Sequence, residues 1–486
     1  MQIRIAWCAA LAVLAACSSA QSLFDAKDRR TVKQTLDKEV HLEVGTPPYA
    51  DRRGAWQVRL TAEGSKWLYA YSRAKAPADA DRSGWASWID AKYAFDRAAA
   101  AQRVAELNGE KVASQKTKAQ PISEYDFDDE GSVGGMEEVP AETVEQSPSK
   151  GNDDLGPMPD GLRDLLGDAP LFVAAVKPQL YKISFGDEPP VSFIDQAPVR
   201  PKYLYFRSGD GVISGGTPIK TLPEDQVRDL CEKAGINEST WRVMRAVSSL
   251  EGGFDSINTY DTGYVSVGFI QFTTGQNGNG SLGSVLLQEK TQDPDAFQKD
   301  FKRYGIDVTD KGVLAVYDAE HDEELVGKDA VLEVMKDKRL SGVFVRAGKL
   351  SEAFRIAQLR LAKDRYYAGD DIVTLKLDEK DVDLRVGDVI KSEAGLAILM
   401  DRKVNTGNIR MLSSVLQNVA EECAAKCADD LAAYEDQIVA SVRFRRDFLA
   451  DTTLSQPGAS ERSLNNLSSR GGSYPRAARK KKAKDR

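Results

Sequence analysis

The stretch that decides the fold runs from Trp241 to Leu282 and reads WRVMRAVSSLEGGFDSINTYDTGYVSVGFIQFTTGQNGNGSL. A helical pattern of apolar residues in its first part ends at Glu251, and the pair Gly252-Gly253 follows. Ten residues after Glu251, Asp261 begins a segment rich in Gly, Ser and Thr whose apolar residues alternate as in a β-hairpin. The stretch therefore predicts a helix and then a small hairpin, with one carboxylate belonging to each.

The two carboxylates are expected to have opposite environments. Met244, Val247 and Glu251 are spaced by three and four residues, so they share one apolar helix face. Burial and the negative end of the helix dipole would then raise the pKa of Glu251. Asp261 lies among polar residues and is expected to stay ionised, with Asp255 as the alternative for its role. Glycosidic bond cleavage requires such a pair, although an exposed Glu and a turn Asp are the simpler alternatives.

A polar segment follows the second carboxylate. The run from residue 264 to 272 is predicted to be one strand with alternating faces, and a flexible run through residue 281 follows it. Neither contains the G-K-[ST] signature of a phosphate loop, which disfavours nucleotide binding. Side chains of this segment suit a groove for a hydroxyl-rich polymer, and the predicted substrate-binding residues are Tyr264, Ser266, Gln271, Thr273 and Asn277.

Composition excludes several classes of function. The 486 residues carry a net charge of −8, which argues against nucleic-acid binding as the main role. The chain has two histidines, His41 and His321, far apart in sequence. A Ser-His-Asp triad, a Cys-His pair or a histidine zinc site is therefore disfavoured, because each needs imidazole. We predict neither a metal nor a cofactor.

The first 17 residues are predicted to be a lipoprotein signal peptide. Arg4 precedes the apolar run Ile5–Ala16, whose 12 residues are too few to span a bilayer. The run ends in Leu-Ala-Ala-Cys17, which resembles a bacterial lipobox and implies lipidation, as by palmitate, at Cys17. Cleavage after Ala20 is the alternative. The expected location is the bacterial cell envelope, lipid-anchored at the outer membrane or periplasm, or otherwise secreted.

Three cysteines would remain in that oxidising compartment. Cys423 and Cys427 are one helical turn apart, so a bond between them would strain the helix. A disulfide from Cys231 to one of them is one expectation, and three buried thiols are the other.

The sequence divides into segments of different composition. Four of the six tryptophans fall between residues 41 and 108, where they form a core or stack on sugar rings. The predicted organisation is a stalk (18–40), a small Trp-rich α+β module (41–108), an acidic disordered linker (109–160), a β-rich segment (161–218), a mainly helical domain (219–450) and a disordered basic tail (451–486).

Within the helical domain, cap signatures occur at Thr221-Leu-Pro-Glu224 and at Asn237. Strands are predicted at 181–185, 191–194 and 203–206, and a β insertion at 372–386. The other predicted helices cover residues 284–304, 329–335, 351–367, 393–399 and 409–448.

Three pieces of this domain resemble the lysozyme superfamily, in its bacterial chitosanase-like and muramidase-like branches. They are the Glu251 helix with the segment from Asp261 to Phe272, the run Phe354–Gln358 with Tyr366-Tyr367, and the run from Ala394 to Gly407. Together they cover about 220 residues. The resemblance implies that Glu251 is the catalytic acid, that Asp261 is the second acid, and that Gln271 occupies the place of a glutamine found in lytic enzymes.

The same resemblance bears on two further residues and on the second acid. Asp401 and Asn405 in its third piece are expected to be structural, capping and bridging helices. Chitosanase-like enzymes place more residues between their two acids than the ten found here.

The expected fold is α+β, with a mainly helical lysozyme-like domain that carries a small β-hairpin. The expected function is hydrolysis of β-1,4 linkages in an amino-sugar polymer, most simply peptidoglycan, with Glu251 as acid and Asp261 as base. A chitosanase, a lytic transglycosylase that uses Glu251 alone, and a non-catalytic peptidoglycan-binding lipoprotein are the alternatives. The expected partners are the polysaccharide and, through the anchor, a membrane.

Overall fold

The computed structural model describes residues 22–45, 57–60, 173–176, 179–194, 211–249, 252–259 and 263–460. Helices and antiparallel sheets alternate along the chain and share one hydrophobic core, which confirms the α+β class. The signal peptide with Cys17, the linker, the predicted strand 203–206, the module's tryptophans and residues 461–486 lie outside the described residues.

The N-terminal segment is helical and packed, so the predicted stalk over residues 18–40 is wrong where the structure describes it. Helix α1 (Ala26–Lys38) begins at a capping box in which the Asp25 side chain accepts from two backbone N–H groups. Its residues Val32 and Leu36 are buried, as is Phe24 before it. The segment has few apolar residues, but their helical spacing places them on one face that packs against the body.

A seven-stranded antiparallel sheet extends the N-terminal segment into the domain. Its order is β1-β4-β5-β6-β7-β8-β9. β1 (Val40–Gly45) pairs with β4 (Leu180–Phe185), so residues 41–45 belong to this sheet and not to a separate module. β4 and β5 (Glu188–Ile194) confirm two predicted strands. β2 (Gln57–Leu60) and β3 (Val173–Val176) form another antiparallel pair.

The remaining strands of the large sheet are short. β6 (Ile213–Ser214) pairs with β7 (Ile257–Asn258), and β8 (Ser266–Val267) and β9 (Phe272–Thr273) follow. The β6–β7 pair joins the segment predicted to end at residue 218 to the helical domain, so the two form one unit.

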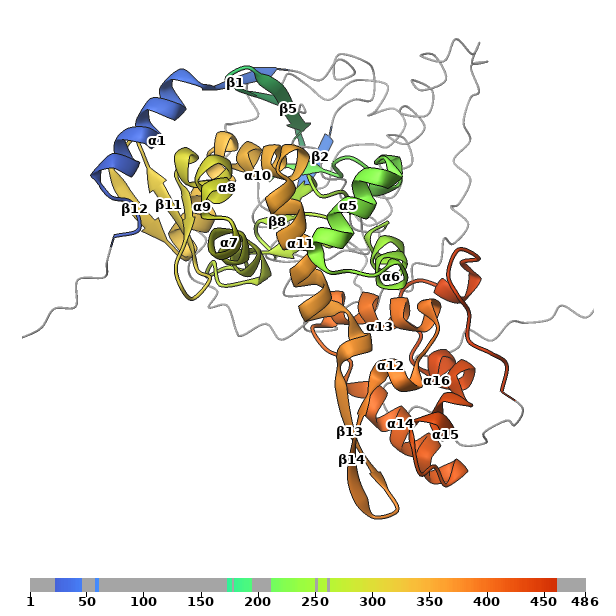
Figure 1. Cartoon of the computed structure of the whole chain (residues 1–486). Coiled ribbons are helices and arrows are strands. Elements are labelled where there is room, and N and C mark those ends of the chain that lie inside the picture. Colours follow the sequence, from blue (N-terminus) through green and yellow to red (C-terminus); the bar gives the residue numbers. More distant parts are fainter. Residues whose placement is uncertain are drawn as a thin grey trace, which may run out of the picture.

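Helices surround this end of the sheet, and α11 runs through the middle of the molecule (Figure 1). Asn237 caps α6 as predicted, through a bond from Thr240 N at 2.8 Å, whereas α5 starts at Pro223 without a side-chain cap. The predicted helix 284–304 is split at Asp293, because Pro294 lacks an N–H group. The helices here are η2 (Ile219–Thr221), α5 (Glu224–Ala234), α6 (Glu238–Ser248), α7 (Ser281–Gln292), α8 (Pro294–Asp300), η3 (Lys302–Tyr304), α9 (Lys328–Lys336), α10 (Lys338–Leu350) and α11 (Glu352–Tyr366).

The sequence did not predict the three-stranded sheet made by β10 (Ile306–Val308), β11 (Leu314–Asp318) and β12 (Glu323–Val326), nor α10. In this sheet β11 pairs antiparallel with both neighbours. Helix α1 lies beside the same sheet (Figure 1).

The last part of the described chain forms a lobe below α11 (Figure 1). The predicted insertion is confirmed as the hairpin of β13 (Ile372–Leu377) and β14 (Lys380–Arg385). The single helix predicted over 409–448 is wrong, because the chain turns at Ala424, with φ +49°, and again at Tyr434. This lobe contains η4 (Ala368–Asp370), α12 (Val386–Val389), α13 (Glu393–Thr406), α14 (Arg410–Cys423), α15 (Ala428–Ala432), α16 (Glu435–Ser441) and η5 (Phe448–Ala450).

The three cysteines of the described chain are free thiols, so the expected disulfide from Cys231 is wrong. Cys231 is buried in α5, and burial raises its pKa to about 11. Cys423 ends α14 in the other lobe and is half-buried, and Cys427 is exposed. Helix α5, which contains Cys231, and helix α14, which ends at Cys423, lie in different lobes of the structure (Figure 1).

Candidate functional site

The helix expected to present the first carboxylate is formed and its apolar face is buried as predicted, but α6 ends before Glu251. Met244 and Val247 of α6 are 0% exposed, and the helix ends at Ser248 with Ser249 as its cap. The described chain resumes at Gly252, whose N–H donates to Ser248 O at 3.0 Å. Glu251 and Asp261 both lie outside the described residues. The geometry below is therefore that of the chain flanking them.

The two glycines after Glu251 are required by space as well as by conformation. Gly252 has φ +136°, and a Cβ there would lie 2.7 Å from the Cβ of Ser256. A Cβ on Gly253 would overlap the carbonyl oxygen of Thr217. The Gly253 N–H donates to Gly215 O at 2.9 Å, so this turn is pinned to the segment before α5.

Hydrogen bonds also fix the chain on both sides of Asp261. Before it, the Thr259 N–H donates to Val212 O at 2.9 Å, and the Thr259 hydroxyl accepts from Val212 N at 2.8 Å. After it, Gly263 O accepts from Gly275 N at 3.2 Å. On either side of these points, β7 pairs with β8, with Asn258 opposite Ser266. The sequence flanking both carboxylates therefore belongs to one β6-β7-β8-β9 unit.

The predicted single strand over residues 264–272 is wrong. β8 spans two residues, the chain turns through Gly268 with φ +87°, and β9 returns antiparallel to β8. Tyr264 and Gln271 take left-handed φ values of +62° and +56° without being glycine. Backbone strain of this kind needs local support, which alternation of apolar residues cannot reveal.

The predicted substrate-binding residues differ in exposure. Ser266 is 3% exposed within the sheet, so it is not available to substrate, which corrects that prediction. Tyr264, Gln271 and Thr273 are half-buried, and Asn277 is exposed.

Of these, Gln271 has the most defined setting. Its amide donates to the Ser256 hydroxyl at 2.7 Å and to Gly268 O at 3.2 Å. The Ser256 hydroxyl in turn donates to Gly268 O at 2.8 Å. Gln271 is therefore held against the turn that follows Gly253.

A residue without a predicted role, Gln358 of α11, joins the two halves of this unit. It is 0% exposed, its amide donates to Phe254 O at 3.1 Å, and its carbonyl oxygen accepts from Phe269 N at 3.3 Å. A Cβ on Gly268 would overlap this carbonyl oxygen. A polar residue on the apolar face of a predicted helix was the signal in the sequence that could have identified it.

Asp255 does not suit the role of alternative base. One carboxylate oxygen accepts from Thr217 N at 2.7 Å and the other from the Thr217 hydroxyl at 3.0 Å. The side chain is 5% exposed and fixes the same turn. Its contacts are structural, which corrects that alternative.

Asp401 and Asn405 make the structural contacts expected of them. Asp401 is 0% exposed in α13 and pairs with Arg445 at 2.7 Å. The Asn405 amide donates to Asp401 O at 2.8 Å. The pair thus connects α13 to the chain after α16.

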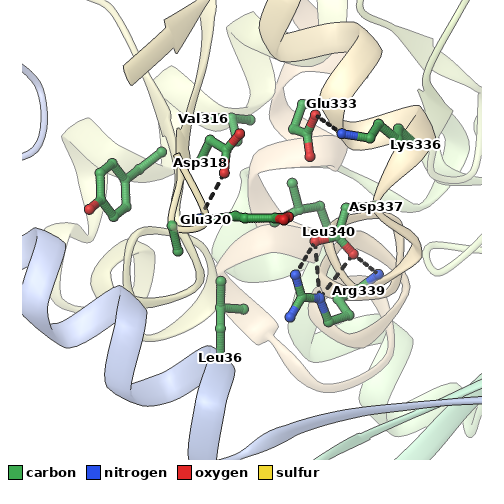
Figure 2. Close-up of a pocket in the computed structure, with 11 residues that line it drawn as sticks. Leu36, Val316, Asp318, Glu320, Glu333, Lys336, Asp337, Arg339 and Leu340 are labelled. Atoms are coloured by element: carbon green, nitrogen blue, oxygen red, sulfur yellow. Dashed lines mark hydrogen bonds and ion pairs between the residues drawn. The ribbon is translucent and has the colours of Figure 1, made fainter. Parts of the chain in front are cut away.

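A cavity of about 200 Å³ lies away from this unit, between α1, β11 and the α9–α10 corner (Figure 2). Its charged groups pair with one another: Lys336 with Glu333 at 3.5 Å and Arg339 with Asp337 at 2.7 Å. Burial raises the pKa of Glu333. The cavity is smaller than typical ligand pockets, and we assign it no function.

The most strongly shifted carboxyl group in the described chain is Glu289 of α7. Burial, together with the negative charge of nearby Asp300, raises the pKa of Glu289 to about 9. Both carboxyl oxygens of Glu289 are buried and make no hydrogen bond within the described chain. At 1% exposed, Glu289 is closed to any substrate and is not a candidate acid.

Searches of family models, of curated proteins and of solved structures found no match to this chain. Among the described residues, no three His, Cys, Asp or Glu side chains are grouped to hold a metal ion. None of the helices described is both long and apolar enough to cross a bilayer.

Proposed function

We propose that the chain is a lysozyme-like glycoside hydrolase of the bacterial envelope, anchored by a lipid on Cys17, that cleaves β-1,4 linkages of peptidoglycan. Glu251 protonates the glycosidic oxygen, and Asp261 activates water on the opposite face of the sugar. Tyr264, Gln271, Thr273 and Asn277 supply contacts to the polymer.

One observation carries the proposal: hydrogen bonds fix the residues that flank both carboxylates to the β6-β7-β8-β9 part of the large sheet and to the turns beside it. Gly252 and Gly253 are pinned by Ser248 and Gly215 on one side. Thr259 and Gly263 are pinned by Val212 and Gly275 on the other. Catalytic groups need a rigid frame, since a displacement of about 1 Å can cost about 100-fold in rate.

A single-acid mechanism is the second candidate, and the setting of Gln271 favours it. The Gln271 amide donates a hydrogen bond to the Ser256 hydroxyl, close to the Gly252-Gly253 turn. Gln271 belongs to the segment from Asp261 to Phe272, which resembles lytic enzymes. Asp255 is occupied by Thr217, so it cannot replace Asp261 if that residue is misplaced. A lytic transglycosylase would then use Glu251 both to protonate the leaving oxygen and to take the proton from the sugar hydroxyl that closes the anhydro ring.

The test is mass spectrometry of the products from purified peptidoglycan and from chitosan. Glu251→Gln is expected to abolish soluble products, because an amide cannot deliver the proton, while Glu232→Gln on the exposed side of α5 serves as the matched control. Reducing ends identify the hydrolase and anhydro ends the transglycosylase. Products from chitosan alone identify a chitosanase.

Two results contradict the proposal. A Glu251→Gln protein as active as the wild type removes Glu251 from the chemistry. A wild-type protein that sediments with sacculi but releases nothing soluble is a binding lipoprotein.

A further inference from the structure

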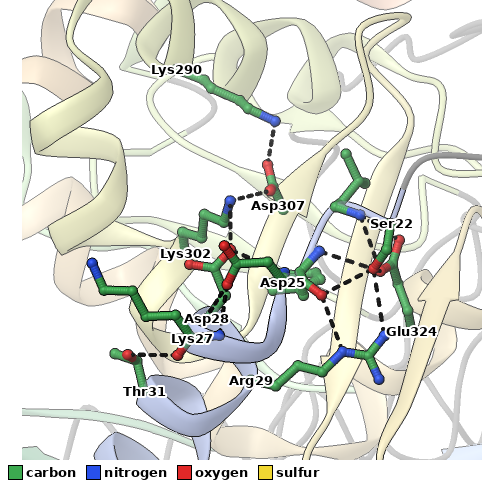
Figure 3. A network of polar contacts seen from close by, with 12 residues as sticks. Ser22, Asp25, Lys27, Asp28, Arg29, Thr31, Lys290, Lys302, Asp307 and Glu324 are labelled. Carbon is green, nitrogen blue, oxygen red and sulfur yellow. Dashed lines mark hydrogen bonds and ion pairs between the residues drawn. The ribbon is translucent and has the colours of Figure 1, made fainter.

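The chain is tied to the folded body from the first residue that the structure describes. The Ser22 hydroxyl donates to the Glu324 carboxylate at 2.7 Å, and Leu23 N donates to it at 3.1 Å (Figure 3). Phe24 follows at 1% exposed, with its ring 5.8 Å from that of Tyr317. The N-terminal end of α1 therefore has a fixed place at the edge of the β10–β12 sheet.

A half-buried ion pair, part of a small network, holds the helix itself. Lys302 pairs with Asp28 of α1 at 3.0 Å and with Asp307 at 3.5 Å, and Lys290 pairs with Asp307 at 2.7 Å (Figure 3). Asp307 is 0% exposed, as is Val32 of the helix. Helix α1 is thus an integral part of the body and does not act as a spacer.

This docking leaves little chain between the body and the proposed anchor. Four residues lie between Cys17 and Ser22, and the five steps from one to the other, at about 3.6 Å each, span at most about 18 Å. Helix α1 is itself about 20 Å long at 1.5 Å per residue. A lipid on Cys17 would therefore bring the N-terminal end of α1 to the headgroup region.

The side of α1 that faces away from the body is basic. No ion pair within the described chain involves Lys27, Arg30 or Lys38, whereas Lys33 pairs with Asp322 at 3.3 Å. The whole chain carries a net charge of −8, so this cationic face, like the basic sequence at the C-terminal end, has the opposite sign to the chain as a whole. The exposed residues of the helix are Ala26, Lys27, Arg30, Lys33, Gln34, Asp37 and Lys38.

We infer that this basic face of α1 is a membrane-binding surface for anionic phospholipid headgroups. This surface would act together with the lipid anchor at Cys17. The inference therefore rests on the proposed anchor and not on the proposed hydrolysis. Each basic residue near an anionic bilayer strengthens binding roughly five-fold. Attraction at α1 would place this helix against the membrane, with the β13–β14 hairpin pointing away from it (Figure 1).

The first experiment measures binding of the unlipidated chain, residues 18–486, to sedimenting vesicles. Vesicles containing phosphatidylglycerol are compared with vesicles of phosphatidylcholine alone. The triple variant Lys27→Gln, Arg30→Gln, Lys38→Gln is expected to bind the anionic vesicles roughly 100-fold more weakly. A matched control removes three exposed lysines of the other lobe, with the substitutions K376Q, K380Q and K426Q, and should bind like the wild type.

Three outcomes of this experiment overturn the inference. They are unchanged binding of the α1 variant, equal loss in the control, and equal binding of the wild type to both kinds of vesicle. Soluble polyphosphate that displaces the protein as well as anionic vesicles do would show a general polyanion site instead of a membrane surface.

The second experiment uses the lipidated full-length protein in vesicles, with a photoreactive side chain at Gln34 or at Glu379 in the β13–β14 turn. Lipid is expected to be labelled from position 34 and not from position 379. Labelling from both positions, or from neither, overturns the inference. Peptidoglycan digestion by the same proteins is scored separately, so loss of the enzymatic proposal is distinguishable from loss of this one.

Discussion

Replacing Glu289 by Gln should make the protein more stable at neutral pH but not at acidic pH. Glu289 lies in the last turn of α7 and is 1% exposed. Asp300 of α8, which lies near Glu289, pairs with Arg346 at 3.2 Å. Burial and this neighbouring charge raise the pKa of Glu289 to about 9, from an ordinary value of 4.5.

The sign follows from proton binding in the two states. Below pH 4.5 the group is protonated both folded and unfolded, and its contribution to stability is fully present. Between 4.5 and about 9 only the unfolded chain loses the proton, so stability falls as the pH rises. The loss at pH 7 corresponds to 2.5 pH units at 1.36 kcal/mol each, or about 3 kcal/mol.

Glutamine has the shape of protonated glutamate, donates a hydrogen bond and does not ionise. Urea unfolding followed by circular dichroism should therefore show Glu289→Gln near the wild type at pH 4 and about 3 kcal/mol more stable at pH 7. Glu232→Gln on the exposed side of α5 is the control and should stay within about 0.5 kcal/mol at both pH values. A gain that does not change between pH 4 and pH 7, or a loss at both, would refute the assignment of the proton to Glu289.

Three further substitutions test the packing described above. Phe24→Ala should cost about 3 kcal/mol and remove hydrogen-exchange protection from residues 26–38, because the anchor of α1 is lost; unchanged protection would mean that the helix docks without it. Gly268→Ala should lower the unfolding free energy by about 2–4 kcal/mol, while Gly275→Ala, also at positive φ but with open space around it, should cost about 1 kcal/mol; equal losses would contradict the overlap behind the larger cost. Asp401→Ala leaves the Arg445 guanidinium without its buried partner and should cost about 3–5 kcal/mol by thermal unfolding; a drop below 1 kcal/mol would show that the pair is not needed.

Local signals in the sequence predicted local structure well. The Asn237 cap, the alternation from Ile372 to Leu377 and the strands around Tyr181 and Val191 each depend on neighbours within a few residues. Each of them forms as predicted. The failures share a different origin, because they depend on contacts between segments distant in the chain.

Helix α1 illustrates this dependence. Its composition is polar, and nothing near it in sequence indicates that Glu324, about 300 residues away, accepts its N-terminal donors. The β10–β12 sheet is similar, because its strands are short and one of them contains the buried Asp307. In the turn from Gly268 to Phe272, Gln271 has a left-handed backbone conformation. The hydrogen bond from its amide to the Ser256 hydroxyl supports this strained conformation.

The candidate site shows both the strength and the limit of helix-face reasoning. Glu251 was expected to share a helix face with Met244 and Val247, because the three are spaced by three and four residues. In α7, Leu282, Leu286 and Glu289 are spaced by four and three residues and likewise share one face. There the structure gives the expected result, a buried carboxyl with a pKa of about 9. Yet Glu289 is sealed inside the body, so a raised pKa on an apolar face does not by itself make a catalytic acid.

The proposal for Glu251 requires that solvent and substrate reach its carboxyl group, whereas Glu289 is 1% exposed and closed to both. The Gly252-Gly253 turn follows the end of α6, and the half-buried Gln271 is held against it through the Ser256 hydroxyl. After Glu289, α7 ends at Gln292, and Asp293 caps α8 at once by accepting from Ala296 N at 2.9 Å. The assignment of Glu251 therefore depends on that turn, and the test of its chemistry is whether a proton held there reaches a polymer that Glu289 can never touch.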